Sequence, residues 1–168
     1  MKIMLVGNNT TFIENLSEKI KEGGLKVFTS SSANEAVNTL IKKKIDVVIL
    51  NMKELQMSGI DILSRIKKVR PLTEVVMLTT PSIIHLSIEG MKLGAFDDLL
   101  LPPDIGDIQR MIIEAGIRKK EKEAEEKKKK KRRSIIDTLD DIAVSATYAE
   151  AGQFETAMEI LKKREKEK

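Results

Sequence analysis

The sequence predicts an α/β fold: a doubly wound, five-stranded parallel sheet, followed by a charged helical extension and a helical hairpin. Over the first hundred or so residues, five short apolar runs alternate with longer segments of helical periodicity. Three of these runs are almost continuous Val, Ile, Leu and Met, which suits strands covered on both faces. Five βα units of this kind predict a functional site at the carboxyl ends of the strands.

The strands and the first helices follow from local signals. Strands are predicted at KIMLVG (2–7), LKVFTS (25–30), IDVVIL (45–50), EVVMLT (74–79) and FDDLLL (96–101). Thr11-x-x-Glu14 and Ser32-x-x-Glu35 have the capping-box pattern of a helix start. Gly23-Gly24 is expected to end the first helix, because glycine adopts the left-handed cap conformation at low cost.

The later helices have weaker boundaries. Ser58 is predicted to cap the third helix, and Pro71 is expected to stop it. The stretch SIIHLSIEGMKLGA (82–95) predicts the fourth helix, and Asp104 the start of the fifth.

The positive charge of the chain is concentrated in one segment. Residues 118–133 contain eleven basic and four acidic side chains, a charge of +7, whereas the whole chain carries +4 and the remainder therefore −3. Lys and Glu are good helix formers, so the fifth helix can continue through this segment as a solvated, charged helical linker. The alternative is that it frays at 127–133, where seven consecutive positive charges repel one another.

Residues 134–168 regain helical periodicity and predict a helix-turn-helix hairpin. Ser134-x-x-Asp137 is expected to cap its first helix, and Gly152 to break the pattern. The two apolar faces consist of Ile135, Leu139, Ile142 and Ala146, and of Phe154, Ala157, Met158 and Leu161. The predicted domains are thus 1–117, 118–133 and 134–168.

Composition excludes several classes of protein. The chain has no Cys, and its only histidine, His85, has no second ligand of metal-site spacing beside it, so we expect no metal and no cofactor. The longest apolar runs are too short for a membrane span, and MKIMLVG is too short for a signal peptide, so we expect a cytoplasmic protein. We find no nucleophile–base pair or glycine-rich phosphate loop and expect no enzyme activity.

Two stretches, DVVILNMKELQMSGIDIL (46–63) and SIEGMKLGAFDDLLLPPDI (87–105), carry a resemblance to a known family. Residues 1–117 resemble the receiver domain of two-component response regulators, which has a flavodoxin-like fold, with Met57 and Gly59 at the family's usual places. The resemblance implies a bacterial-type phosphorelay, in which a histidine kinase phosphorylates an aspartate that ends the third strand. Mg²⁺, two further acids and a lysine assist this reaction in the family.

The sequence departs from that pattern at most of these positions. The phosphoacceptor aligns with Asn51, and the lysine that precedes proline aligns with Leu101. The acidic pair aligns with Gly7 and Asn8, the switch aromatic with Asp98, and only the switch hydroxyl is kept, as Thr79. These replacements imply a pseudo-receiver that acts independently of phosphorylation. The alternative is a receiver that still senses an anion or a metal through Asn8, Asn51 and Thr79.

Two candidate interfaces remain. The resemblance implies a protein-binding or homodimer surface on the fourth helix, fifth strand and fifth helix, drawn from Lys92, Asp97, Asp98, Arg110 and Ile113. In the hairpin, Tyr148, Gly152, Phe154 and Ala157 resemble one tetratricopeptide-type repeat, and Leu161 extends its apolar face. A lone repeat cannot bury its apolar face, so it must pack on the receiver, on another copy or on a partner.

The sequence therefore predicts a signalling protein that acts through protein–protein contacts. The alternative is a nucleic-acid-associated regulator that binds phosphate backbones through the basic run 127–133. The run has no interleaved aromatic residues, which disfavours base readout. Salt dependence separates the two, because phosphate-backbone binding weakens steeply with salt and apolar docking does not.

Overall fold

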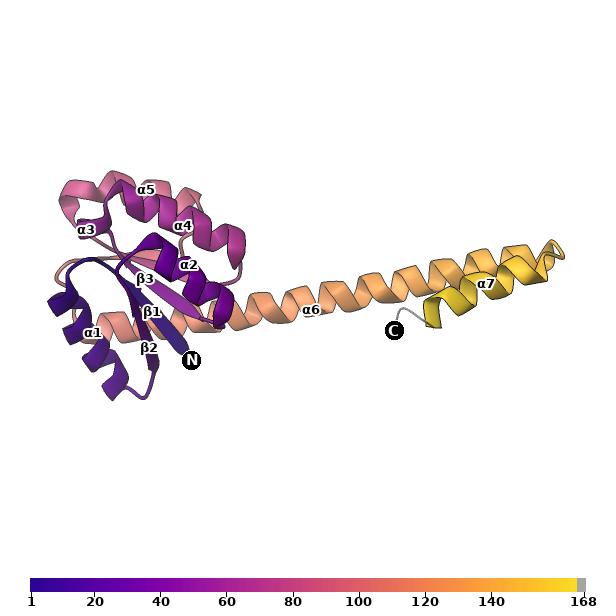
Figure 1. Cartoon of the computed structure of the whole chain (residues 1–168), viewed down its shortest axis with the longest axis horizontal. Helices are drawn as coiled ribbons and strands as arrows, with labels where there is room; N and C mark the ends of the chain where they lie inside the picture. Colours follow the sequence, from indigo (N-terminus) through magenta and orange to yellow (C-terminus); the bar gives the residue numbers. More distant parts are fainter. Residues whose placement is uncertain (166–168) are drawn as a thin grey trace. The chain divides into compact units, whose positions relative to one another are not determined.

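The structure, a computed structural model, describes residues 1–165. Residue contacts divide the chain into two compact units, residues 1–122 and the part that begins at Glu123, and each is described by itself. One helix, α6 (Ile105–Glu150), continues from the first unit into the second (Figure 1).

The first unit is built on a five-stranded, all-parallel sheet with the order β2-β1-β3-β4-β5. The strands are β1 (Lys2–Val6), β2 (Lys26–Ser30), β3 (Val47–Asn51), β4 (Glu74–Thr79) and β5 (Asp97–Leu100). The chain order reverses between β1 and β3, so the sheet is doubly wound and the predicted fold class is confirmed.

Helices cover both faces of this sheet. They are α1 (Thr10–Glu22), α2 (Ala33–Lys42), α3 (Met52–Leu55), α4 (Met57–Val69), the 3₁₀ turn η1 (Pro81–Ile83), α5 (Ile84–Lys92) and the start of α6. One core lies between the sheet and α2 to α5, and the other lies between the sheet and the pair α1 and α6. Along β1, Met4 and Val6 face the first core while Ile3 and Leu5 face the second. Burial on both faces explains the continuous apolar runs in the sequence.

The predicted helix boundaries had mixed outcomes. Ser32 caps α2 as predicted, since its hydroxyl accepts from the backbone N–H of Glu35. The predicted cap at Thr11 was wrong, because the cap of α1 is Asn9, whose side chain accepts from the N–H of Phe12. Ser58 was also wrong, because α4 already begins at Met57 and the Ser58 hydroxyl instead donates to a carbonyl of the preceding turn.

Helix α6 does not stop at the charged segment. It runs for 46 residues and includes all of 118–133, as the helix propensities of Lys and Glu predict. The predicted cap at Ser134 was wrong, because this residue lies inside α6 and its carbonyl accepts from the Thr138 hydroxyl as in a continuous helix. Within residues 1–165, no helix is both long and apolar enough to cross a membrane.

The second unit is a helical hairpin formed by the end of α6 and by α7 (Phe154–Glu165). The chain turns at Gly152, whose φ of +77° favours glycine, and the predicted break there is confirmed. The Ser145 hydroxyl donates to the carbonyl of Ala157 at 3.1 Å and joins the two helices.

Candidate functional site

The carboxyl ends of the strands meet at one edge of the sheet, as in other doubly wound folds. At this carboxyl edge lie the positions that the sequence singled out: Gly7 and Asn8 after β1, Asn51 at the end of β3, Thr79 at the end of β4 and Leu101 after β5. A Cβ atom built on Gly7 would lie 3.2 Å from the Cβ of Asn51, so β1 and β3 approach closely here. The backbone N–H of Leu101 donates to the Thr79 carbonyl at 2.8 Å and joins the other two strand ends.

Asn51 occupies the centre of this edge and is only 2% exposed. Its Nδ2 donates to Oε1 of Glu54 at 2.6 Å. Its Oδ1 is buried and has no hydrogen-bond partner among the described atoms. A buried amide oxygen without a donor is costly, so Asn51 is an orphaned acceptor beside a carboxylate.

Glu54 is the residue that sequence reasoning missed. Its Oε2 accepts from the backbone N–H groups of Asn8 at 2.8 Å and Asn9 at 2.7 Å, while Oε1 accepts from Asn51. A Cβ on Gly7 would lie 3.2 Å from the same Oε2, so the bare glycine leaves room for this carboxylate. The available signal was the Asn51-x-x-Glu54 spacing, which in the one-turn helix α3 brings the two side chains together.

The other positions of the edge are tied to their own neighbours. Thr79 is fully buried, and its hydroxyl makes only a long 3.5 Å bond to the carbonyl of Thr80. Asp98, on β5, accepts from the hydroxyl of Ser87 on α5 at 3.1 Å. Leu101 is half-buried and packs against the core between the sheet, α1 and α6.

The opposite, amino edge of the sheet holds a second charged cluster that the sequence did not indicate. Glu74, fully buried at the start of β4, pairs with Lys67 of α4 at 3.5 Å and with two residues of α6, Arg118 at 3.7 Å and Lys122 at 2.6 Å. Three cations around one buried carboxylate anchor the beginning of the charged segment to the sheet. Residues 118–133 were expected to form a solvated linker, and this was wrong for Lys119, which is 4% exposed, and for the half-buried Lys122, whereas Arg118 is exposed as expected.

Asp46, also at the amino edge, is paired with the buried Lys119. Lys119 Nζ donates to Asp46 Oδ1 at 2.7 Å and to the Ile45 carbonyl at 3.0 Å, and the N–H of Lys2 donates to Asp46 Oδ2 at 2.8 Å. Burial alone would raise the pKa of Asp46, but the bonds from Lys119 and Lys2 outweigh it and hold the pKa below 3.8. Burial lowers the pKa of Lys67 below 10.5, and the neighbouring Glu74 carboxylate only partly offsets this.

The predicted interface residues of the first unit are exposed. Lys92, Asp97, Arg110 and Ile113 all lie at the surface of α5, β5 and α6, and Arg110 pairs with Asp107 one turn earlier at 3.0 Å. Exposed apolar side chains accompany them on these elements: Ile84, Ile88, Met91, Leu100, Ile113 and Ile117. His85 is also exposed on α5.

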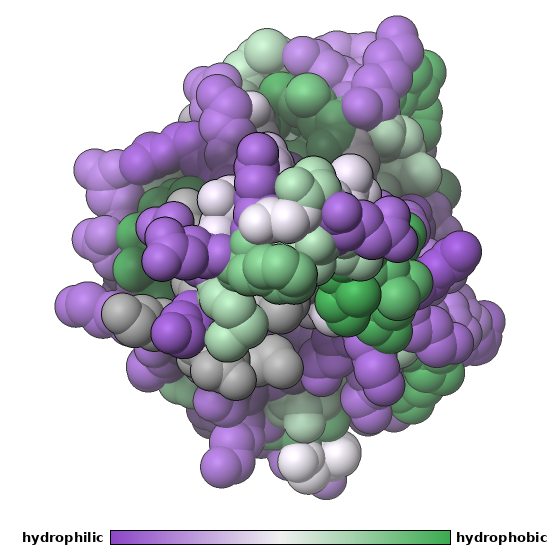
Figure 2. Space-filling model, turned by 90° about the vertical axis from the view of Figure 1, so that its right-hand side faces the viewer, coloured by the Kyte–Doolittle hydropathy of each residue, from purple (hydrophilic) through white to green (hydrophobic). Residues whose placement is uncertain are grey.

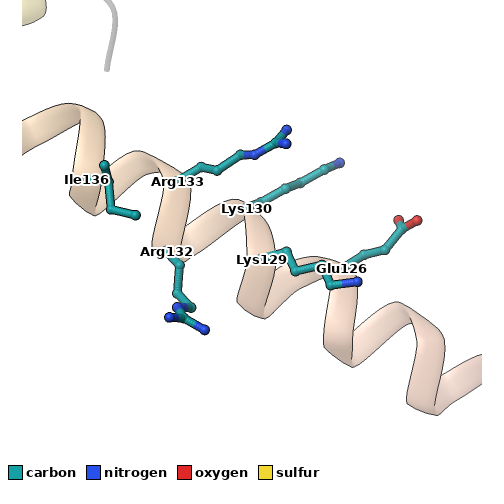
Figure 3. A pocket seen from close by; sticks show the side chains of 6 residues that line it. All are labelled: Glu126, Lys129, Lys130, Arg132, Arg133 and Ile136. Atoms are coloured by element: carbon teal, nitrogen blue, oxygen red, sulfur yellow. The ribbon is translucent and has the colours of Figure 1, made fainter.

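In the second unit, Tyr148 and Phe154 are 38% and 66% exposed, and the side chain of Leu161 lies outside the described residues. A space of about 600 Å³ borders the basic run, lined by Glu126, Lys129, Lys130, Arg132, Arg133 and Ile136. Figure 3 shows that these side chains fan out from one helix rather than converging on a common point. Among residues 1–165, no three His, Asp or Glu side chains gather closely enough to hold a metal ion.

The parallel sheet and its carboxyl-edge site define a signalling domain of the receiver class. The family model for the response regulator receiver domain matches residues 3–113, and the chain belongs to this family. The chain is 36% identical to a response regulator receiver domain protein from Clostridium thermocellum, with a TM-score of 0.67 over 71% of this chain and 96% of that one.

Two curated relatives share the same region. The transcriptional regulatory protein ZraR of Escherichia coli is 26% identical over 113 residues, which are 67% of this chain and 26% of the relative. The response regulator protein PilR of Pseudomonas aeruginosa is 33% identical over 99 residues, 58% of this chain and 22% of the relative. The chain thus spans about a quarter of the length of these relatives.

Proposed function

We propose that this receiver domain signals through protein contacts without accepting a phosphoryl group. The observation that carries the proposal is the Glu54 carboxylate, which lies at the carboxyl edge and accepts from Asn8, Asn9 and Asn51. A carboxylate of the chain itself thus occupies the space beside Asn51, the position that aligns with the phosphoacceptor.

The chemistry of the neighbouring residues supports the same conclusion. The Asn51 amide is not a useful nucleophile toward phosphorus, and Leu101 supplies no charge to a transferring phosphoryl group. Two like charges about 4 Å apart repel by about 4 kcal/mol at an effective dielectric near 20, so Glu54 would oppose a phosphate placed beside it. The glycine at position 7 leaves room for the Glu54 carboxylate at this edge, because a side chain there would crowd it.

The output surface in this proposal is formed by α5, β5 and α6. It combines the exposed apolar side chains of these elements with Lys92, Asp97 and Arg110 at its margin. Apolar side chains rimmed by charges are typical of protein interaction sites. We therefore infer a protein partner in a signalling pathway, with a homodimer through this surface as one form of that contact.

Ligand sensing is a second candidate, and one observation favours it. Within the described part of the chain the buried Oδ1 of Asn51 has no donor, and a small hydrogen-bond donor or a cation would satisfy it. Nucleic-acid binding through residues 127–133 has less support, because consecutive residues of a helix project in different directions, as Figure 3 shows for Lys129, Lys130 and Arg132.

The test is an amide NMR spectrum with and without Mg²⁺ and beryllofluoride, a phosphoryl mimic. We expect the resonances of Gly7, Asn8, Asn51 and Thr79 to stay in place, and the intact mass to stay unchanged after incubation with acetyl phosphate. The double variant Asn51→Asp/Glu54→Gln serves as the comparison, because it exchanges the positions of carboxylate and amide. Saturable shifts in the unmodified protein, or a mass increase of one phosphoryl group, would contradict the proposal.

A further inference from the structure

The hairpin of the second unit leaves an apolar face exposed. Ile135, Leu139 and Ile142 of α6 are 49%, 60% and 51% exposed, and Ala146 is exposed as well. Their spacing of four, three and four residues is that of a coiled-coil seam, in which such positions are normally buried against another helix. Figure 2 shows in general that green apolar side chains reach the surface among purple hydrophilic ones.

Helix α7 does not cover this face. The helices meet through Ser145 and Ala157, which are each 5% exposed and joined by a hydrogen bond. Ser145 lies about 80° around α6 from the centre of the seam, at 100° per residue. In an antiparallel pair of right-handed helices, the flank of α7 on that same side carries Phe154 and Met158, which are 66% and 53% exposed. Both helices therefore contribute to a single open apolar face.

Charge is distributed unevenly along the same hairpin. Residues 127–133 are all basic, residues 134–160 contain six acidic and no basic side chains, and residues 162–164 near the end of α7 are basic again. A parallel pair of such hairpins would place the two basic runs side by side. An antiparallel pair separates the basic runs and brings each toward the acidic hairpin of the other copy, which is charge-complementary.

We propose that this apolar face binds a second copy of the chain, with the two α6 helices antiparallel about a two-fold axis. Leu139 of one copy then lies against Ile142 of the other, and Ile135 lies against Ala146. At the margin, Arg132 of each copy approaches Glu150 of the other. Two hairpins joined face to face form a four-helix arrangement that buries the seam and closes on itself, so dimers do not grow into filaments. This surface is separate from α5, β5 and the part of α6 proposed above as the output surface.

The first test is the mass of the full chain in solution, measured by sedimentation over a range of concentrations. We expect a concentration-dependent dimer. Ile142→Glu and Leu139→Glu should each raise its dissociation constant by at least about tenfold, because each places a charge in a buried seam. Val144→Glu is the matched control: Val144 is 47% exposed on the same helix but lies about 180° from the seam, so its dimer should match the unmodified one.

The second test fixes the orientation by disulfide formation, which is simple because the chain has no Cys. In the antiparallel arrangement two Leu139 residues are about 4 Å apart along the axis, and two Arg132 residues about 26 Å, at 1.5 Å per residue. Leu139→Cys should therefore cross-link readily under mild oxidation, and Arg132→Cys should not.

Three outcomes would overturn the proposal. They are a monomer at every concentration, a dimer that Val144→Glu weakens as much as Ile142→Glu does, and cross-linking of Arg132→Cys as ready as that of Leu139→Cys, because only parallel helices place both pairs of residues at the same level. A monomer whose apolar face is covered only when another protein is added would show a different occupant. Circular dichroism of each variant confirms that the helices are intact, as expected for changes at exposed positions.

Discussion

The two edges of the sheet bind their carboxylates through different groups: N–H groups hold Glu54 at the carboxyl edge, and cations hold Asp46 and Glu74 at the amino edge. At the carboxyl edge, the carboxylate of Glu54 is held by N–H groups of Asn8, Asn9 and Asn51. At the amino edge, the carboxylates of Asp46 and Glu74 are held by the cations of α4 and α6. Both edges belong to the same 122-residue unit, so the difference lies in which residues stand at each edge and not in two separate domains.

The contrast shows that this domain places its buried ion pairs at the amino edge of the sheet. A charge in a protein interior must be paired with an opposite charge, because an unpaired buried charge strongly destabilises the fold. The amino edge meets this condition with Lys67, Arg118 and Lys122 around Glu74, and the result is a mechanical link between the sheet and α6. At the carboxyl edge an amide replaces the expected carboxylate, which is consistent with the proposal that phosphoryl chemistry is absent there.

The largest expected effect is the loss of Glu74. Glu74→Ala leaves three cations around a buried site without their anion, and we expect the free energy of unfolding to fall by about 3 to 5 kcal/mol. Urea unfolding followed by circular dichroism measures this change. Arg110→Ala is the control, since its pair with Asp107 is exposed and should contribute less than about 1 kcal/mol. Similar losses for the two variants would remove the distinction between an anchoring cluster and a surface ion pair.

Asn51→Asp tests the other edge. The new carboxylate would face Oε1 of Glu54 at the place where Nδ2 now donates from 2.6 Å, and an attraction would become a repulsion. We expect a loss of about 2 kcal/mol at pH 7, less than for a fully buried pair, because Glu54 is only half-buried. The loss should shrink as the pH falls and one of the two carboxylates takes up a proton. The double variant Asn51→Asp/Glu54→Gln should recover most of the stability, and a double that is as unstable as the single variant would show that Glu54 is not the cause.

Much of the comparison could be predicted from the sequence, and the remainder has identifiable physical causes. Asn51, Thr79 and Leu101 follow apolar runs, so their places at the carboxyl edge were predictable from strand order alone. Glu54 was not, because its role depends on a single turn of helix after β3, between the predicted third strand and the predicted third helix.

The partners of Glu74 lie 44 and 48 residues away on α6 and close only in the tertiary fold, so the amino edge left no local pattern. The basic residues of 118–122 looked solvated because their anions are on other elements. Periodicity and capping signals describe only residues that are close in sequence, so they could not predict these ion pairs between distant parts of the chain.

The pH dependence of stability should report the Asp46–Lys119 pair. The pKa of Asp46 is lower in the folded chain than 3.8, so this pair stabilises the fold above that pH, and the contribution is lost as the pH falls through the folded value. Lys119→Met should cost about 1.5 kcal/mol at pH 7 for the lost charge-assisted hydrogen bond. Unfolding curves at pH 7 and at pH 3 should show the gap between variant and unmodified protein narrowing at the lower pH. A constant gap would mean that Lys119 contributes through packing and its bond to the Ile45 carbonyl and not through Asp46.

The smallest effect concerns the start of α1, next to the Glu54 carboxylate. Asn9 caps this helix through the N–H of Phe12 at 3.0 Å, whereas the sequence indicated Thr11, which lies inside the first turn. Asn9→Ala should therefore cost about 1 kcal/mol, and Thr11→Ala less than about 0.5 kcal/mol. Because the backbone N–H of Asn9 also donates to Glu54, a disturbed helix start in Asn9→Ala should in addition shift the side-chain amide resonance of Asn51, which shares that carboxylate, while Thr11→Ala leaves it in place. A larger loss of stability for Thr11→Ala than for Asn9→Ala would show that Thr11 caps the helix, as the capping-box pattern indicated. The start of α1 would then not depend on the residue whose N–H binds Glu54.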